Sequence, residues 1–98
     1  MQDHLLSLRR LCLQGRDIAF SQAFLSWRRE GHAASWRGTV RGEGLEELGF
    51  DEDEVALEGE TLDGRSVTGR ARVLRLESSW AALQIEGLGP LVVQGRAL

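Results

Sequence analysis

Residues 55–73 read VALEGETLDGRSVTGRARV and carry the clearest β-strand pattern in the chain. On either side of Gly64, apolar or small side chains alternate with polar ones, which is the period of two that a half-buried strand shows. The Asp63-Gly64 pair between the two runs is typical of a tight turn. The pattern predicts a β-hairpin.

The face on which each side chain lies predicts the register of this hairpin. A two-residue loop would place the apolar residues of one strand on the same face as the arginines of the other. A three-residue loop over residues 62–64, with Gly64 in the left-handed conformation as a bulge, separates the apolar face from the charged face. The pairs expected in this register are Leu57 with Gly69, Val55 with Ala71, and Glu54 with Arg72.

Period two continues outward from the hairpin. Residues 34–41 alternate around Trp36, and residues 81–85 and 91–93 form two further short apolar runs. The pattern slips phase after Val73, which indicates a bulge or a bend. Five short antiparallel strands with a glycine-rich corner are enough to form a small SH3-like or OB-like barrel, and an open curved sheet is the alternative.

The N-terminal third follows helical spacing. Residues 3–14 and 18–30 are each expected to form a helix, because their apolar residues recur at intervals of three and four positions and a glycine follows each run. The apolar positions concerned are Leu5, Leu8 and Cys12 in the first helix, and Phe20, Ala23, Phe24 and Trp27 in the second.

The expected fold class is therefore α+β, in one domain over residues 1–98. A helical hairpin over residues 1–31 would pack on an antiparallel barrel or curved sheet over residues 33–98, which carries an acidic loop at residues 43–54. The side chains expected to be buried together are Phe20, Phe24, Trp27, Val40, Leu57, Val67 and Val73.

A resemblance adds to this expectation. The segments WRR (27–29), WRGTV (36–40), DGRSVTGRA (63–71) and AAL (81–83) resemble, in their order, the SH3-like C-terminal domain of biotin-protein ligases. The acidic stretch has no counterpart in that pattern, and neither the biotinyl-adenylate loop nor the catalytic domain of that family is matched. The resemblance implies an accessory barrel and not ligase activity.

Composition narrows the class of protein. The chain has 98 residues, of which 42% are hydrophobic and 28% charged, as in an ordinary globular domain. All twelve basic residues are Arg, and Lys, Asn and Tyr are absent, which indicates a GC-rich bacterial or phage gene. No apolar run approaches the roughly 18 residues that span a bilayer, and the first residues lack a basic signal region, so we expect a cytoplasmic protein.

Catalytic and metal-binding residues are scarce in the sequence. A single cysteine, Cys12, allows neither an intramolecular disulfide nor a multi-cysteine zinc site. The two histidines, His4 and His32, stand in no nucleophile motif, and the acidic run lacks the spacing of a calcium loop. We therefore expect no enzyme activity, no cofactor and no metal.

Charge is strongly segregated along the chain. Residues 1–41 hold seven Arg against three carboxylates, residues 42–63 hold ten carboxylates and no base, and residues 64–98 hold five Arg against two carboxylates. We expect a non-catalytic binding or adaptor domain whose acidic loop engages a protein with a basic surface, or a second copy of the chain. The residues expected to contact that partner are Glu46, Glu47, Phe50, Asp51, Glu52, Asp53 and Glu54.

The alternative function is nucleic-acid binding. Arginine beside tryptophan is the combination that single-strand recognition uses. The residues that would serve this alternative are Arg28, Arg29, Trp36, Arg37 and Arg41. The sequence pI near 5.3 disfavours it, because phosphate contacts need a basic surface.

Overall fold

The computed structural model describes residues 4–31, 33–43, 45, 54–77 and 82–97. These residues contain no α-helix, and hence no helix that could cross a membrane. The expected α+β class and the helical hairpin over residues 1–31 are therefore wrong, because the described chain is all β.

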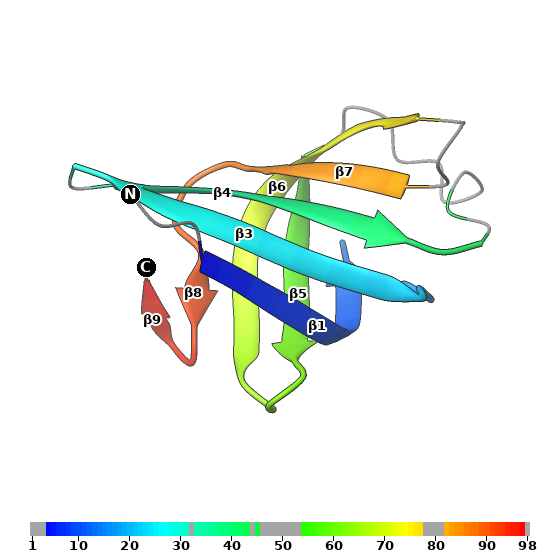
Figure 1. Cartoon of the computed structure of the whole chain (residues 1–98), viewed down its shortest axis with the longest axis horizontal. Helices are drawn as coiled ribbons and strands as arrows, with labels where there is room; N and C mark the ends of the chain where they lie inside the picture. Colours follow the sequence, from blue (N-terminus) through cyan, green and yellow to red (C-terminus); the bar gives the residue numbers. More distant parts are fainter. Residues whose placement is uncertain (1–3, 32, 44, 46–53, 78–81, 98) are drawn as a thin grey trace.

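Nine strands follow one another within the described residues (Figure 1). They are β1 (His4–Leu13), β2 (Arg16–Asp17), β3 (Gln22–Glu30), β4 (Ala33–Arg41), β5 (Glu54–Thr61), β6 (Ser66–Glu77), β7 (Ala82–Gly87), β8 (Val92–Val93) and β9 (Arg96–Ala97).

Six of the strands close into an antiparallel barrel. Going round the barrel, β1 pairs with β3, β3 with β4, β4 with β7, β7 with β6, β6 with β5, and β5 with β1 again. Figure 1 shows β3, β4 and β7 side by side across the molecule, with β5 and β6 crossing them. The expectation of five strands missed β1 and β3, without which the barrel cannot close.

The barrel interior is filled by aliphatic side chains at alternate positions of each strand. Each barrel strand contributes at least one side chain that is at most 1% exposed, namely Leu13, Leu25, Val40, Leu57, Val73 and Ile85. Complete burial of an aliphatic side chain of this size is worth about 1.5–3 kcal/mol, so these positions supply much of the stabilisation.

Strand β1 imitates helical spacing because it contains a bulge. Leu6 and Leu8 face the core, and the register then shifts between Leu8 and Arg10 before Leu11 and Leu13 face the core again. The inserted residue separates Leu8 from Leu11 by three positions, and Leu6 from Leu13 by seven, which are also the spacings of one helix face. The prediction of a helix over residues 3–14 is wrong for this reason.

The second predicted helix, residues 18–30, is also wrong, because most of it is strand β3. Ala23 and Leu25 are buried in the barrel, and Trp27 packs against the core at its edge. Phe24 lies between them on the opposite face of the strand and is only half-buried. Of the seven side chains expected in the core, the four on β4, β5 and β6 are confirmed as buried, Phe20 and Trp27 pack against the core in part, and Phe24 does not belong to it.

The turn after β1 explains why Gly15 follows the apolar residues of that strand. Gln14 and Gly15 have φ angles of 53° and 76°, and Leu13 pairs directly with Arg16. Two central residues with positive φ define a type I′ turn, whose twist matches that of the strands it joins. Gly15 therefore reverses a β-hairpin and does not end a helix.

The register predicted for residues 54–73 is confirmed. Leu57 pairs with Gly69 and Val55 pairs with Ala71, so the two strands share one buried face. Gly64 has a φ of 90°, in the left-handed region that its lack of a side chain permits. The phase slip expected after Val73 is confirmed as well, since the pairing of β6 with β7 shifts between Leu74 and Glu77.

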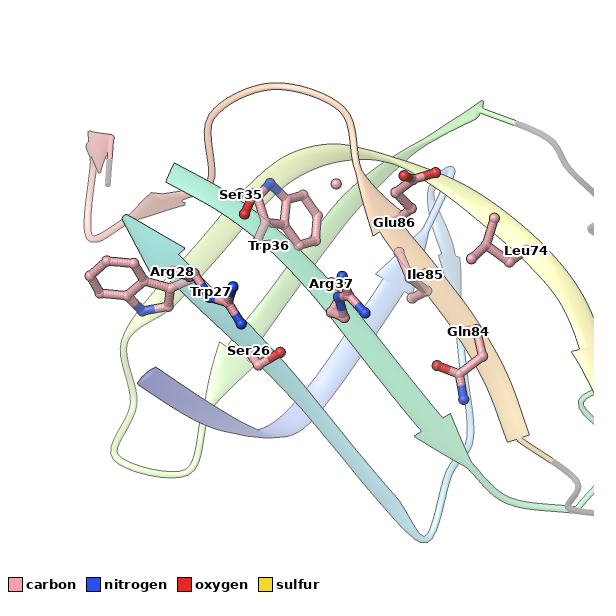
Figure 2. Close-up of a pocket in the computed structure, with 11 residues that line it drawn as sticks. Ser26, Trp27, Arg28, Ser35, Trp36, Arg37, Leu74, Gln84, Ile85 and Glu86 are labelled. Carbon is pink, nitrogen blue, oxygen red and sulfur yellow. The ribbon is translucent and has the colours of Figure 1, made fainter. Parts of the chain in front are cut away.

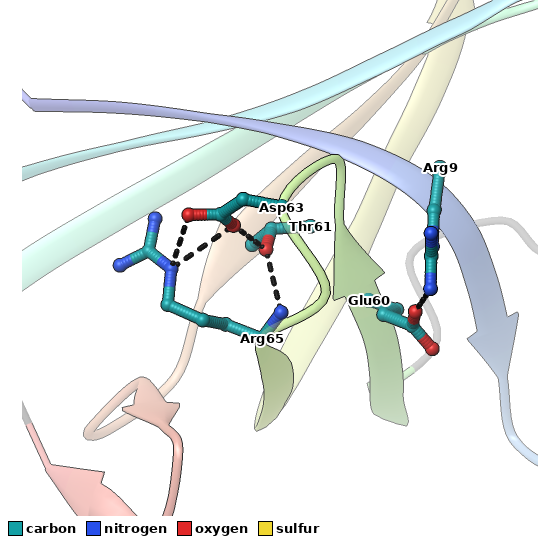
Figure 3. A network of polar contacts seen from close by, with 5 residues as sticks. All are labelled: Arg9, Glu60, Thr61, Asp63 and Arg65. Atoms are coloured by element: carbon teal, nitrogen blue, oxygen red, sulfur yellow. Dashed lines mark hydrogen bonds and ion pairs between the residues drawn. The ribbon is translucent and has the colours of Figure 1, made fainter.

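A small polar network fixes the tip of the β5–β6 hairpin (Figure 3). The Thr61 hydroxyl donates to the carboxylate of Asp63 and accepts a bond from the backbone N–H of Arg65, at 2.9 Å. The Arg65 guanidinium lies 3.1 Å from both carboxylate oxygens of Asp63. Nearby, Arg9 at the β1 bulge forms an ion pair with Glu60, which links β1 to β5.

Asp63 is expected to make the stability of the domain pH-dependent in acid. The hydrogen bonds from Thr61 and Arg65 lower the pKa of the Asp63 carboxyl in the folded state. The stabilisation is complete above the ordinary carboxyl pKa of about 4 and is lost as the pH falls through the lower folded pKa. Asp63→Asn should flatten the fall in unfolding free energy between about pH 5 and pH 2, measured by chemical denaturation.

Glu58→Gln, which removes an exposed carboxylate from the same hairpin, is the control. Equal slopes for the wild type and Asp63→Asn would contradict the assignment.

Candidate functional site

A groove lies on the outer face of the barrel. It has a volume of about 480 Å³ and lies across β3, β4 and β7, with Leu74 of β6 at one side. Outward-facing residues of three neighbouring strands line it, because side chains at alternate positions of a strand point to the same face. The principal polar side chains in its wall are Ser26, Arg28, Ser35, Arg37, Gln84 and Glu86.

Two arginines and two serines occupy one square of this face. Ser26 of β3 is paired with Arg37 of β4, and Arg28 of β3 is paired with Ser35 of β4. The two arginines therefore lie on one diagonal of the square and the two serines on the other. Figure 2 shows the guanidinium groups of Arg28 and Arg37 near each other, with Ser26 and Ser35 beside them.

Acidic side chains limit the positive charge on the side of the groove toward β6. Arg37 is paired with Glu86 of β7, and Glu86 is paired in turn with Arg72 of β6. Arg72 reaches Glu54 of β5 at 3.4 Å, and Arg70 reaches the same carboxylate at 3.9 Å. Positive and negative charges thus alternate across the strands, and the pair of arginines on β3 and β4 forms the positive end.

Trp36 borders the groove but presents no ring to it. Only 4% of the residue is exposed, and its indole N–H donates to the carbonyl oxygen of Gly89 at 2.9 Å. Trp27 stacks on the imidazole of His4, with ring centroids 4.1 Å apart and planes inclined by 15°. Neither ring is placed over Arg28 and Arg37 in Figure 2, where the Trp27 side chain points away from the groove.

The structure brings together part of the residue set predicted for nucleic-acid binding. Arg28 and Arg37 share the groove, whereas Trp36 is buried and does not offer a stacking surface. Arg29 and Arg41 are exposed, but they do not line the groove.

The set predicted for partner binding falls almost entirely outside the described residues. Glu46, Glu47, Phe50, Asp51, Glu52 and Asp53 lie there, and their role stays a prediction. Glu54, which is described, lies at the start of β5 and forms ion pairs with Arg70 and Arg72.

Sequence reasoning missed Ser26, Ser35, Gln84 and Glu86. The alternation that turns Ser26 and Arg28 to one face becomes visible only when residues 22–30 are treated as a strand. A helix over these residues would instead point Ser26 and Arg28 in different directions, so the helical interpretation could not place them on one face with residues of β4.

The remaining reactive side chain is Cys12. Its thiol donates to Oδ1 of Asp17 at 2.7 Å, across the β1–β2 pair. This hydrogen bond, followed by burial and the Asp17 charge, raises the pKa of the Cys12 thiol, which favours the protonated and less nucleophilic form. Among the described residues, no group of three or more His, Cys, Asp or Glu side chains could hold a metal ion.

Comparison with protein-family models, with curated proteins and with solved structures finds no match to this chain.

Proposed function

We propose that this chain is a non-catalytic binding domain that holds an acidic segment of a partner protein in the groove across β3, β4 and β7. The observation that supports the proposal is that Arg28 and Arg37 lie diagonally across neighbouring strands and both line one concave face. Charge-assisted hydrogen bonds from arginine to carboxylate are among the stronger polar contacts that a surface can make.

The character of the groove wall favours an extended protein segment. Hydroxyl, amide and guanidinium groups can bond a peptide backbone as well as its side chains, and Leu74, which is 37% exposed, supplies an apolar contact at one side. Thr39 donates to the side chain of Gln84 at 3.1 Å, which orients the Gln84 amide beside the groove.

The described contacts disfavour nucleic acid as the ligand. Single-strand recognition relies on aromatic faces on which bases stack, and Trp36 is buried with its N–H already bonded.

The test is fluorescence anisotropy with a labelled Glu-rich peptide and, in parallel, a labelled single-stranded oligonucleotide of similar length. Arg37→Glu should weaken peptide binding by about tenfold or more, because it reverses a charge at the centre of the groove. Arg96→Glu is the matched control, since it makes the same change at an exposed position of β9 that does not line the groove.

Equal peptide affinity in Arg37→Glu and Arg96→Glu would overturn the proposal. Tighter, Arg37-dependent binding of the oligonucleotide would overturn it in favour of nucleic-acid recognition. Thermal unfolding of both variants establishes that any loss of binding reflects the groove and not the fold.

A further inference from the structure

We propose that Arg28, Arg37, Ser26 and Ser35 form a subsite for a phosphate monoester, so that the partner segment is recognised in its phosphorylated form. This inference depends on the proposed function, and it specifies the chemistry of one position of the ligand. It arises from how two kinds of donor are arranged on β3 and β4.

The four side chains surround a single point on the sheet. Residues directly opposite on antiparallel strands have Cβ atoms about 4.5–5.5 Å apart, and diagonal neighbours are about 7–8 Å apart. The long side chains of Arg28 and Arg37 can therefore reach an anion from two sides, while the shorter hydroxyls of Ser26 and Ser35 lie at the other two corners. Figure 2 shows all four side chains around the same part of the groove.

The arrangement of the donors suits a phosphate better than a carboxylate. A guanidinium binds a planar carboxylate with two parallel N–H bonds that lie in one plane. A phosphate monoester presents three terminal oxygens that point in different directions, and it can accept bonds from both guanidinium groups and from the hydroxyls together. Arg28 also has an interaction within the protein, and a guanidinium carries five N–H donors in all.

The charge of the subsite also fits a phosphate. A phosphate monoester carries a charge of about −1.5 to −2 near neutral pH, so it attracts two guanidinium groups more strongly than a carboxylate with a single charge does. The side chain of Arg37 is exposed and lines the groove, so a ligand can reach it from solvent.

Glu86 restricts the site to an isolated phosphate. It lies opposite Arg37 on β7, on the side of the square that faces β6. A second anion placed there would meet its carboxylate without a compensating donor, which costs binding energy. A phosphorylated side chain carries one phosphate and avoids this contact, whereas a polynucleotide carries one at every residue.

The experiment compares three peptides with one acidic sequence and a central Ser, Glu or phosphoserine. Isothermal titration with the wild-type chain should give about tenfold or more tighter binding of the phosphoserine peptide than of the Glu peptide. Ser35→Ala should weaken binding of the phosphoserine peptide several-fold more than binding of the Glu peptide. Ser66→Ala, at an exposed serine of β6 that does not line the groove, should change neither.

The outcomes separate this inference from the proposed function. Equal affinities for the Glu and phosphoserine peptides would overturn the phosphate subsite and leave the binding groove in place. A loss in Ser35→Ala that is the same for both peptides would also overturn it, because it would show a general distortion of β4. Failure of all three peptides to bind would overturn the proposed function itself.

Discussion

Trp36→Ala is expected to lower the free energy of unfolding by about 3–5 kcal/mol. The indole is the largest side chain in the barrel core, and it is 4% exposed. It packs against Gly69 of β6 and Gly87 of β7, and its N–H donates to Gly89 in the turn that follows β7. One side chain of β4 thus connects three other segments of the chain, and its removal leaves a cavity that the strand backbones cannot close.

Urea denaturation of the wild type, Trp36→Ala and Trp36→Phe measures this effect. Trp36→Phe keeps much of the ring volume but loses the indole N–H, so the carbonyl of Gly89 loses its partner, and the variant should fall between the other two. A loss below about 1 kcal/mol in Trp36→Ala would show that the indole does not hold β4 against β6 and β7.

Gly87→Ala is expected to cost about 2–3 kcal/mol, although it adds one methyl group. A Cβ atom built at Gly87 would lie 2.3–2.5 Å from three atoms of the Trp36 ring, which is closer than any real contact. The same ring is also packed closely against β6, because a Cβ atom built at Gly69 would lie 3.0 Å from its Cζ2 atom. The absence of a side chain at these two positions is what gives the indole its place in the core.

A double-mutant cycle makes this explanation specific. In the Trp36→Ala background the added methyl group meets no ring, so Gly87→Ala should cost less than about 1 kcal/mol there. Denaturation of the two single variants and the double variant gives the coupling. Additive losses would mean that Gly87 is required for a reason other than contact with Trp36.

The β5–β6 hairpin was predictable from sequence because its information is local. The alternation of apolar and charged side chains permits one register only, and the pairs of Leu57 with Gly69 and of Val55 with Ala71 have that register. A hairpin with a short loop needs no distant segment to define it, which is why its bulged turn at Gly64 was predictable as well.

The N-terminal strands were not predictable by periodicity, because the β1 bulge gives strand residues helical spacing. A different signal was present. The tripeptide Gln-Gly-Arg occurs at residues 14–16 and again at 94–96, and in both places the Gln and the Gly have positive φ angles between 53° and 78°. Both are two-residue hairpin turns, so the repeated tripeptide indicates a β-hairpin at each position.

The candidate site was predictable only in part, for a related reason. Arg28 and Arg37 were conspicuous as basic residues, but their proximity to Ser26, Ser35 and Glu86 depends on the pairing of β3 with β4 and of β4 with β7. The β3–β4 neighbours are close in the chain, but the helical interpretation of residues 18–30 concealed their pairing, whereas Glu86 is distant from Arg37 in the chain and no local pattern places it there. The acidic residues 46–53 lie outside the described structure, so the docking role predicted for them still needs its own test.

The closure of the barrel by β1 and β5 has a consequence for the order of folding. Strand β1 cannot complete its hydrogen bonds until β5, which comes later in the chain, has been synthesised, because β5 pairs with one of its edges. Until then, β1, β3 and β4 can form only an open three-stranded sheet with an exposed apolar face and two unpaired edges. Contacts between segments so distant in the chain slow folding and lengthen the period in which nascent chains can associate wrongly. The β4 edge of that sheet stays unprotected for longer still, because its partner is β7 at residues 82–87.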